Sequence, residues 1–116
     1  MDLHHPQDFR LLEALHSYGR NVAPNLAHIA DLDESMAERR LAALADHELV
    51  TRIGPIAESG LFEITDRGRI ALRLRDEYNE GVDFGALVDR HLAVDDTGAA
   101  TAIIRGKRRT NEDADS

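Results

Sequence analysis

The 116-residue sequence contains no cysteine and no tryptophan. The missing thiol excludes disulfides, thiolate metal sites, iron–sulfur clusters and a cysteine nucleophile. No apolar run approaches the roughly 20 residues that a membrane span needs. The polar, acidic N-terminus is unlike a secretory signal peptide. We therefore expect one cytoplasmic domain with a single core and no membrane partner.

Lysine is nearly absent as well. Of the 14 basic residues only Lys107 is a lysine, and 22 acidic residues give a formal net charge of −8. Dense carboxylates with little lysine are typical of proteins that work in molar salt. Replacement of lysine by arginine in a GC-rich genome is the alternative. Taken alone, this charge argues against a nucleic-acid partner.

Helix signals follow one another through the first half of the chain. Pro6 and Gly19 bound a first helix, Pro24 begins a short second helix, and Asp33 can cap a third. The third helix has an apolar stripe at i, i+4 and i+7 that we expect to face the core, formed by Ala37, Leu41 and Leu44.

The period of the pattern then changes. Residues 49–53 and 61–64 are typical of two strands joined by turn residues, which predicts a β-hairpin. Thr65 can cap a fourth helix running to about residue 79, with Leu72 pointing away from the core, and a fifth helix is expected over residues 83–92. The predicted fold class is mainly α with a small β-hairpin, in the order of a winged helix-turn-helix.

Three segments carry a family resemblance when they are taken in this order. They are DLDESMAERRLAALADHELV (residues 31–50), the hairpin, and FEITDRGRIAL (residues 62–72). Together they resemble archaeal winged-helix transcription regulators, notably haloarchaeal phage-repressor-like and PadR/MarR-like proteins, among them an oxidative-stress regulator. The resemblance implies a sequence-specific DNA-binding regulator. If it answers oxidants, oxidation of Met36 or a bound ligand or metal would replace cysteine chemistry.

The residue pattern and the resemblance together predict a domain organisation. A winged helix-turn-helix domain is expected over residues 1–80, a C-terminal helical dimerisation segment over residues 81–104, and a mobile charged tail over residues 105–116. One departure is visible. Glu48 stands where the family usually has the glycine that ends the recognition helix, which predicts a different helix end and a changed hairpin angle.

The third helix is long enough to enter a major groove with its outward side chains on base edges. Arg39 can make two bonds to guanine, Glu38 can accept from the amino group of cytosine, and Ala42 can touch a thymine methyl. A solvated helix face is the alternative. The predicted base-contacting residues are Ser35, Glu38, Arg39 and Ala42.

Phosphate contacts are expected from the segments that flank this helix. For Arg40 a surface ion pair is the alternative, and the hairpin tip carries Glu58, so we expect few contacts there. The basic run over residues 105–109 either grips the DNA backbone or is a solvated tail. The predicted phosphate-contacting residues are Arg20, Asn21, Asn25, Arg40, Arg52 and Ser59.

Surplus apolar surface on the first and fifth helices predicts a homodimer, which would bind palindromic double-stranded DNA. The predicted interface residues are Leu11, Leu15, Tyr18, Leu72, Phe84, Leu87, Val88 and His91.

Signals for catalysis and for metal binding are missing. The six histidines include no pair at the His-x-x-x-His spacing, and no phosphate loop, nucleophile elbow or paired-carboxylate motif occurs. We therefore expect no enzyme, no metal site and no cofactor, with salt ions bound at the DNA interface and a metal or small-molecule effector left open. The alternative function is a winged-helix protein–protein adaptor without direct DNA readout.

Overall fold

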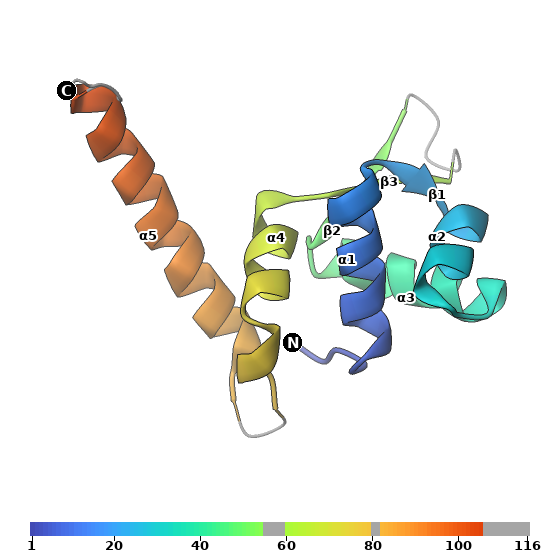
Figure 1. The fold of residues 1–116 in the computed structure, drawn as a ribbon. Helices are drawn as coiled ribbons and strands as arrows, with labels where there is room; N and C mark the ends of the chain where they lie inside the picture. The colour runs from blue at the N-terminus through green and yellow to red at the C-terminus, as the bar shows by residue number, and fades with distance from the viewer. Residues whose placement is uncertain (55–59, 80–81, 106–116) are drawn as a thin grey trace. The chain divides into compact units, whose positions relative to one another are not determined.

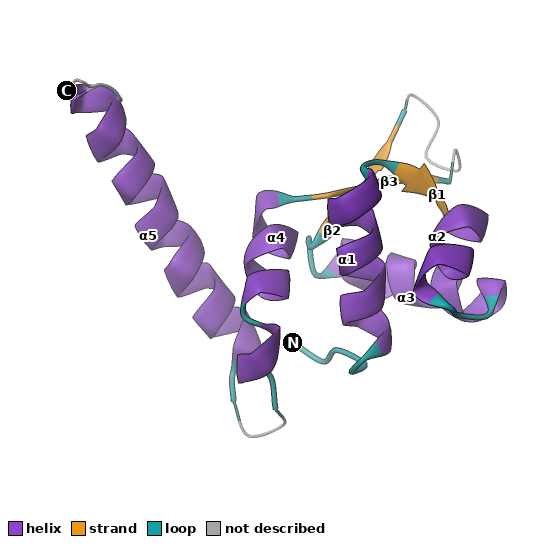
Figure 2. Cartoon of the chain, viewed as in Figure 1, coloured by secondary structure: helices purple, strands orange, loops and turns teal. Residues whose placement is uncertain are grey.

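The computed structural model describes residues 1–54, 60–79 and 82–105, with side chains described up to residue 94. The chain forms two compact units, Met1–Phe84 and Gly85–Ser116. It is mainly helical with a small antiparallel sheet (Figures 1 and 2). Its elements are α1 (Gln7–Tyr18), β1 (Asn21–Val22), α2 (Ala23–Ala30), α3 (Glu34–Asp46), β2 (Val50–Ile53), β3 (Leu61–Ile64), α4 (Asp66–Arg73), the 3₁₀ turn η1 (Arg75–Glu77) and α5 (Phe84–Arg105).

The first helix is bounded, and the second and third helices begin, where the sequence predicts. Gly19 follows α1 and donates its N–H to the carbonyl of Leu15 at 2.9 Å. Pro24 lies in the first turn of α2, and the Asp33 carboxylate caps α3 by accepting from the N–H of Met36 at 3.2 Å. The core of the first unit is formed largely by fully buried leucines of these helices: Leu11, Leu12, Leu15, Leu26, Leu41 and Leu44.

The end of α3 corrects the expectation about Glu48. Glu48 adopts φ 63°, the left-handed conformation that a glycine would supply. The helix therefore ends with the common left-handed residue, although here that residue carries a side chain. The N–H of Leu49 donates to Leu44 at 2.9 Å and that of Glu48 to Ala45 at 2.9 Å. These two bonds form a Schellman motif. Thr65 fixes the exit by donating its hydroxyl to the Glu48 carbonyl at 2.7 Å.

The sheet has three strands rather than the two of the predicted hairpin, in the order β1-β3-β2. The hairpin strands pair in an antiparallel register that sets Val50 opposite Ile64. β1 adds to the other edge of β3 through Asn21 opposite Phe62 and Val22 opposite Leu61. A two-residue strand has no period for a sequence pattern to reveal, which is why β1 was not predicted.

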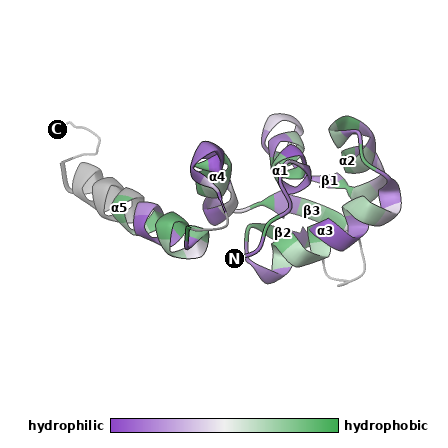
Figure 3. Cartoon of the chain, turned by 90° about the horizontal axis from the view of Figure 1, so that it is seen from below, coloured by the Kyte–Doolittle hydropathy of each residue, from purple (hydrophilic) through white to green (hydrophobic). Residues whose placement is uncertain are grey.

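The fourth helix is shorter than predicted, because α4 ends at Arg73 and the 3₁₀ turn η1 follows it. The N–H of Leu74 bonds to both Ile70 and Ala71, which tightens the last turn. The expected outward direction of Leu72 is wrong, since this side chain is buried. Figure 3 shows hydrophobic and hydrophilic residues side by side along α4.

Aromatic residues are few, yet three of the five form one cluster in the first unit. Phe9 and Tyr78 meet edge to face at 5.8 Å between ring centroids, and Tyr78 and Phe84 at 5.1 Å. The Tyr78 hydroxyl accepts from the N–H of Leu3 at 3.0 Å and donates to its carbonyl at 2.9 Å. The N-terminal segment is thereby attached to the residue that follows η1.

Helix α5 begins at Phe84, the last residue of the first unit, and is continuous to Arg105; it is the described element of the second unit. It therefore continues past residue 92, through the rest of the helical segment expected over residues 81–104. Among the residues that the structure describes, no helix combines the length and the apolar content needed to cross a bilayer. The predicted charged tail lies outside the described residues, apart from the backbone of Arg105.

Candidate nucleic-acid interface

Helix α3 separates its residues into a buried and an exposed side. Leu41 and Leu44 are fully buried, which fixes the opposite side toward solvent. Three of the four residues predicted to contact bases are exposed and Ala42 is half-buried. The Arg39 guanidinium lies over the preceding turn and donates from Nη1 to Ser35 Oγ at 3.4 Å. The predicted direction of this face is confirmed; contact with bases stays a prediction.

Polar side chains gather where α2 begins. The Asn21 carbonyl oxygen Oδ1 accepts from the backbone N–H of Val22 and from Asn25 Nδ2, both at 2.9 Å. Arg20 is exposed, and its Nη2 lies 3.8 Å from Glu63 Oε2. The first turn of a helix presents unpaired N–H groups that favour anions. These residues can therefore approach a phosphate together with the backbone of α2.

Arg52 is the predicted phosphate contact on the sheet. Its guanidinium carbon stands 5.1 Å from the centroid of the Phe62 ring on the neighbouring strand, within cation–π range. The contact holds an exposed cation in place without neutralising its charge. Ser59 and Glu58 of the hairpin loop lie outside the described residues.

Arg40 requires a correction. Its guanidinium is directed inward and bonds Asp8 twice, from Nε to Oδ1 and from Nη2 to Oδ2, each at 2.8 Å. The hydrogen bond to Asp8 raises the pKa of Arg40 above its ordinary value, against the opposing effect of burial. A guanidinium held in this way does not supply the predicted phosphate contact. The partner lies 32 positions away in sequence, so helix periodicity alone could not reveal it.

The predicted dimer interface also needs correction. Leu11, Leu15, Leu72 and Phe84 are buried, so the broad apolar arc of α1 is not free for a partner. Val88 is buried too, while Leu87 and His91 are half-buried, with His91 Nδ1 3.0 Å from the Leu87 carbonyl oxygen. Tyr18 is 67% exposed. Of the predicted apolar surface, Tyr18 alone is widely exposed.

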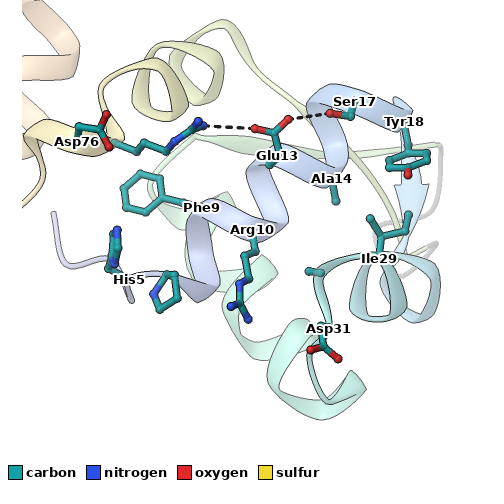
Figure 4. A pocket seen from close by; sticks show the side chains of 13 residues that line it. His5, Phe9, Arg10, Glu13, Ala14, Ser17, Tyr18, Ile29, Asp31 and Asp76 are labelled. Carbon is teal, nitrogen blue, oxygen red and sulfur yellow. Dashed lines mark hydrogen bonds and ion pairs between the residues drawn. The ribbon is translucent and has the colours of Figure 1, made fainter.

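The first unit carries a groove of about 600 Å³ that the sequence did not indicate. It lies along α1 and is bordered by the end of α2 and by η1 (Figure 4). Glu13 on its wall pairs with Arg75 Nη1 at 3.3 Å and accepts from Ser17 at 2.7 Å. Charged side chains of both signs line it. In the described part of the chain, no three potential metal ligands form a group.

Comparison with known proteins gives a structural likeness and no family assignment. No protein-family model matches the chain. No curated protein matches it. The crystal structure of Rv1404 from Mycobacterium tuberculosis is similar over 84% of this chain and 75% of that one, with 23% identity and a TM-score of 0.54. At this identity the likeness extends to the fold alone, a mainly helical chain with a small antiparallel sheet, consistent with a winged-helix-like arrangement.

Proposed function

We propose that this chain is a sequence-specific DNA-binding transcription regulator of the winged helix-turn-helix type. The observation that carries the proposal is the two-sided α3, which buries Leu41 and Leu44 and exposes Ser35, Glu38 and Arg39. A helix of 13 residues held by the core on one side can enter a major groove with the other. Arg39 would then read guanine through its two parallel donors.

The flanking residues fit a supporting role on the DNA backbone. Arg20 and Asn25 are exposed at the start of α2, and Arg52 is exposed on β2. Contacts of this kind fix the register of a protein on the duplex but carry no sequence information. The β2–β3 hairpin would be the wing.

We also propose that the regulator binds as a homodimer to palindromic sites. Val94 on α5 is 68% exposed, and α5 is the one described element of its unit. An exposed apolar side chain such as Val94 would be covered in a dimer, and two-fold dimers are the commonest oligomers. Half-sites would then lie about one helical turn, or a multiple of it, apart.

Selection from a random duplex pool in near-molar KCl tests this function. We expect enrichment of a palindromic sequence that the protein binds at least about a thousandfold more tightly than random duplex, as specific regulators do. No enrichment, with equal affinity for all duplexes, would contradict direct readout. Such an outcome would favour the adaptor alternative, for which the net charge of −8 is no handicap.

A further inference from the structure

Asp8 is a charged side chain with no exposed surface. It lies in the first turn of α1, where the helix dipole favours a carboxylate. Two parallel bonds of 2.8 Å join its two oxygens to Nε and Nη2 of Arg40 in the middle of α3. This fork-to-fork arrangement is the most directional form of an ion pair, because both the distance and the plane of the groups are fixed.

The carboxylate is held from a second side as well. The backbone N–H of His4 donates to Asp8 Oδ2 at 2.8 Å, and the N–H of Asp8 donates to the His4 carbonyl at 2.8 Å. The neighbouring Leu3 is attached at both its N–H and its carbonyl to the Tyr78 hydroxyl. Asp8 is therefore held in place by the N-terminal segment independently of α3, and it anchors α3 through Arg40.

Stability alone does not account for this pair. A buried ion pair can be replaced by apolar residues of similar volume without loss of stability, because desolvation offsets its attraction. The leucines of α3 hold the helix to the core through apolar contacts, which have no preferred direction. The pair to Asp8 adds a directional restraint. It is also screened by salt far less than exposed pairs such as Glu13–Arg75.

We propose that Asp8 is a positioning residue that sets the rotation of α3 through Arg40 and thereby directs Arg39 toward the bases. Arg39 and Arg40 are adjacent, so a rotation that loosens the Asp8 pair also moves the Arg39 guanidinium. Base readout by a bidentate guanidinium depends on the direction of the side chain, whereas contacts to phosphates tolerate a change in that direction. The inference rests on the proposed function, because it concerns how accurately the same helix reads DNA.

Two variants and a control test the inference. Arg40→Lys keeps the charge and an ion pair with Asp8 but loses the second parallel bond. The double variant Asp8→Leu/Arg40→Met replaces the pair with apolar residues, so that neither charge is left buried without its partner. Glu13→Gln is the matched control. Glu13 lies on α1, as Asp8 does, and the substitution removes its exposed ion pair with Arg75 of η1.

The measurement is the ratio of dissociation constants for scrambled and selected duplexes in near-molar KCl, together with Tm. We expect the double variant to keep its Tm while its ratio falls about tenfold, part of what a bidentate base contact contributes. The ratio of Arg40→Lys should also fall, whereas Glu13→Gln should leave the ratio unchanged. Because the ratio cancels contacts to phosphates, a direct role of Arg40 on the DNA backbone would leave it unchanged.

A wild-type ratio in either Arg40 variant would overturn the positioning role and leave the proposed function intact. A second result would also count against the positioning role. If the ratio of Arg40→Lys fell in proportion to its Tm, and both recovered in the double variant, the pair would only stabilise the fold. A wild-type protein that shows no preference for any duplex would instead contradict the proposed function itself.

Discussion

Glu48 occupies a backbone conformation that costs a residue with a Cβ about 1–2 kcal/mol, since its φ is 63°. We expect Glu48→Gly to raise the free energy of unfolding by about 0.5–1 kcal/mol, because the relief of this strain exceeds the added entropy of the unfolded chain. Chemical denaturation at constant KCl measures the difference. Asp31→Gly is the control: φ is 59° there too, but aspartate tolerates this region, so its gain should be smaller.

Gly68 is a close-packed position in α4. A Cβ added there would stand 2.0 Å from the carbonyl oxygen of Leu49 and 2.8 Å from Ile64 Cγ1. The backbone oxygen of Leu49 accepts from the N–H of Thr65, so it cannot give way. We expect Gly68→Ala to lower the free energy of unfolding by about 2–3 kcal/mol, although alanine is the better helix former. Arg69→Ala, at the exposed neighbouring position, should change it by less than about 0.5 kcal/mol.

At the scale of elements, the sequence predicts what local signals determine. Asp33 and Thr65 cap helices because their side chains reach N–H groups three residues ahead, and both caps are present. The burial of Leu72 and the inward direction of Arg40 depend on elements far along the chain. Arg40 lies between the two faces of its helix, where periodicity permits either a surface position or a buried partner. The exposed part of α3 was predictable, whereas the anchor that holds it was not.

The proposed base contact from α3 and the proposed phosphate contact from β2 give the next prediction. Arg39→Ala should relax sequence preference and weaken binding to the selected site by about 1–3 kcal/mol, because a bidentate base contact is lost. Arg52→Ala should weaken binding to selected and scrambled duplexes alike, because a phosphate contact carries no sequence information. Fluorescence anisotropy with both duplexes measures the two effects. Unchanged affinity of Arg39→Ala for the selected site would show that α3 is oriented differently on DNA.

At the scale of the whole molecule, dimerisation should depend on α5. Light scattering at micromolar concentration and high salt is expected to give twice the chain mass of 12.9 kDa. Val94→Glu places a charge on the exposed apolar surface of α5 and should shift the protein toward the monomer. Leu11 and Leu15 cannot serve this test, because their substitution would open the core. A monomeric wild type would remove the proposed two-fold binding mode.

The net charge of −8 conflicts with DNA binding only in dilute salt. In molar KCl the Debye length is about 3 Å, so long-range repulsion between the protein and the phosphates largely disappears. The usual gain from counterion release disappears too, because the bulk ions are already concentrated. Short-range hydrogen bonds and shape then carry the affinity. Acidic side chains that would lie close to phosphates in the proposed complex, such as Glu38 and Glu63, would take up cations as the complex forms.

The affinity for the selected duplex should therefore change little, or rise, between about 0.2 and 2 M KCl. Uptake of cations by carboxylates opposes the release of cations from phosphates, so the two contributions to the salt slope offset each other. Titrations at fixed pH across this range measure the slope, and Glu38→Gln should make it steeper in the negative direction, because one uptake site is removed. A wild-type slope near −0.9 per phosphate contact would mean that about one counterion is released at each contact. This slope would identify an ordinary basic-face DNA binder and contradict the salt adaptation inferred from the single lysine.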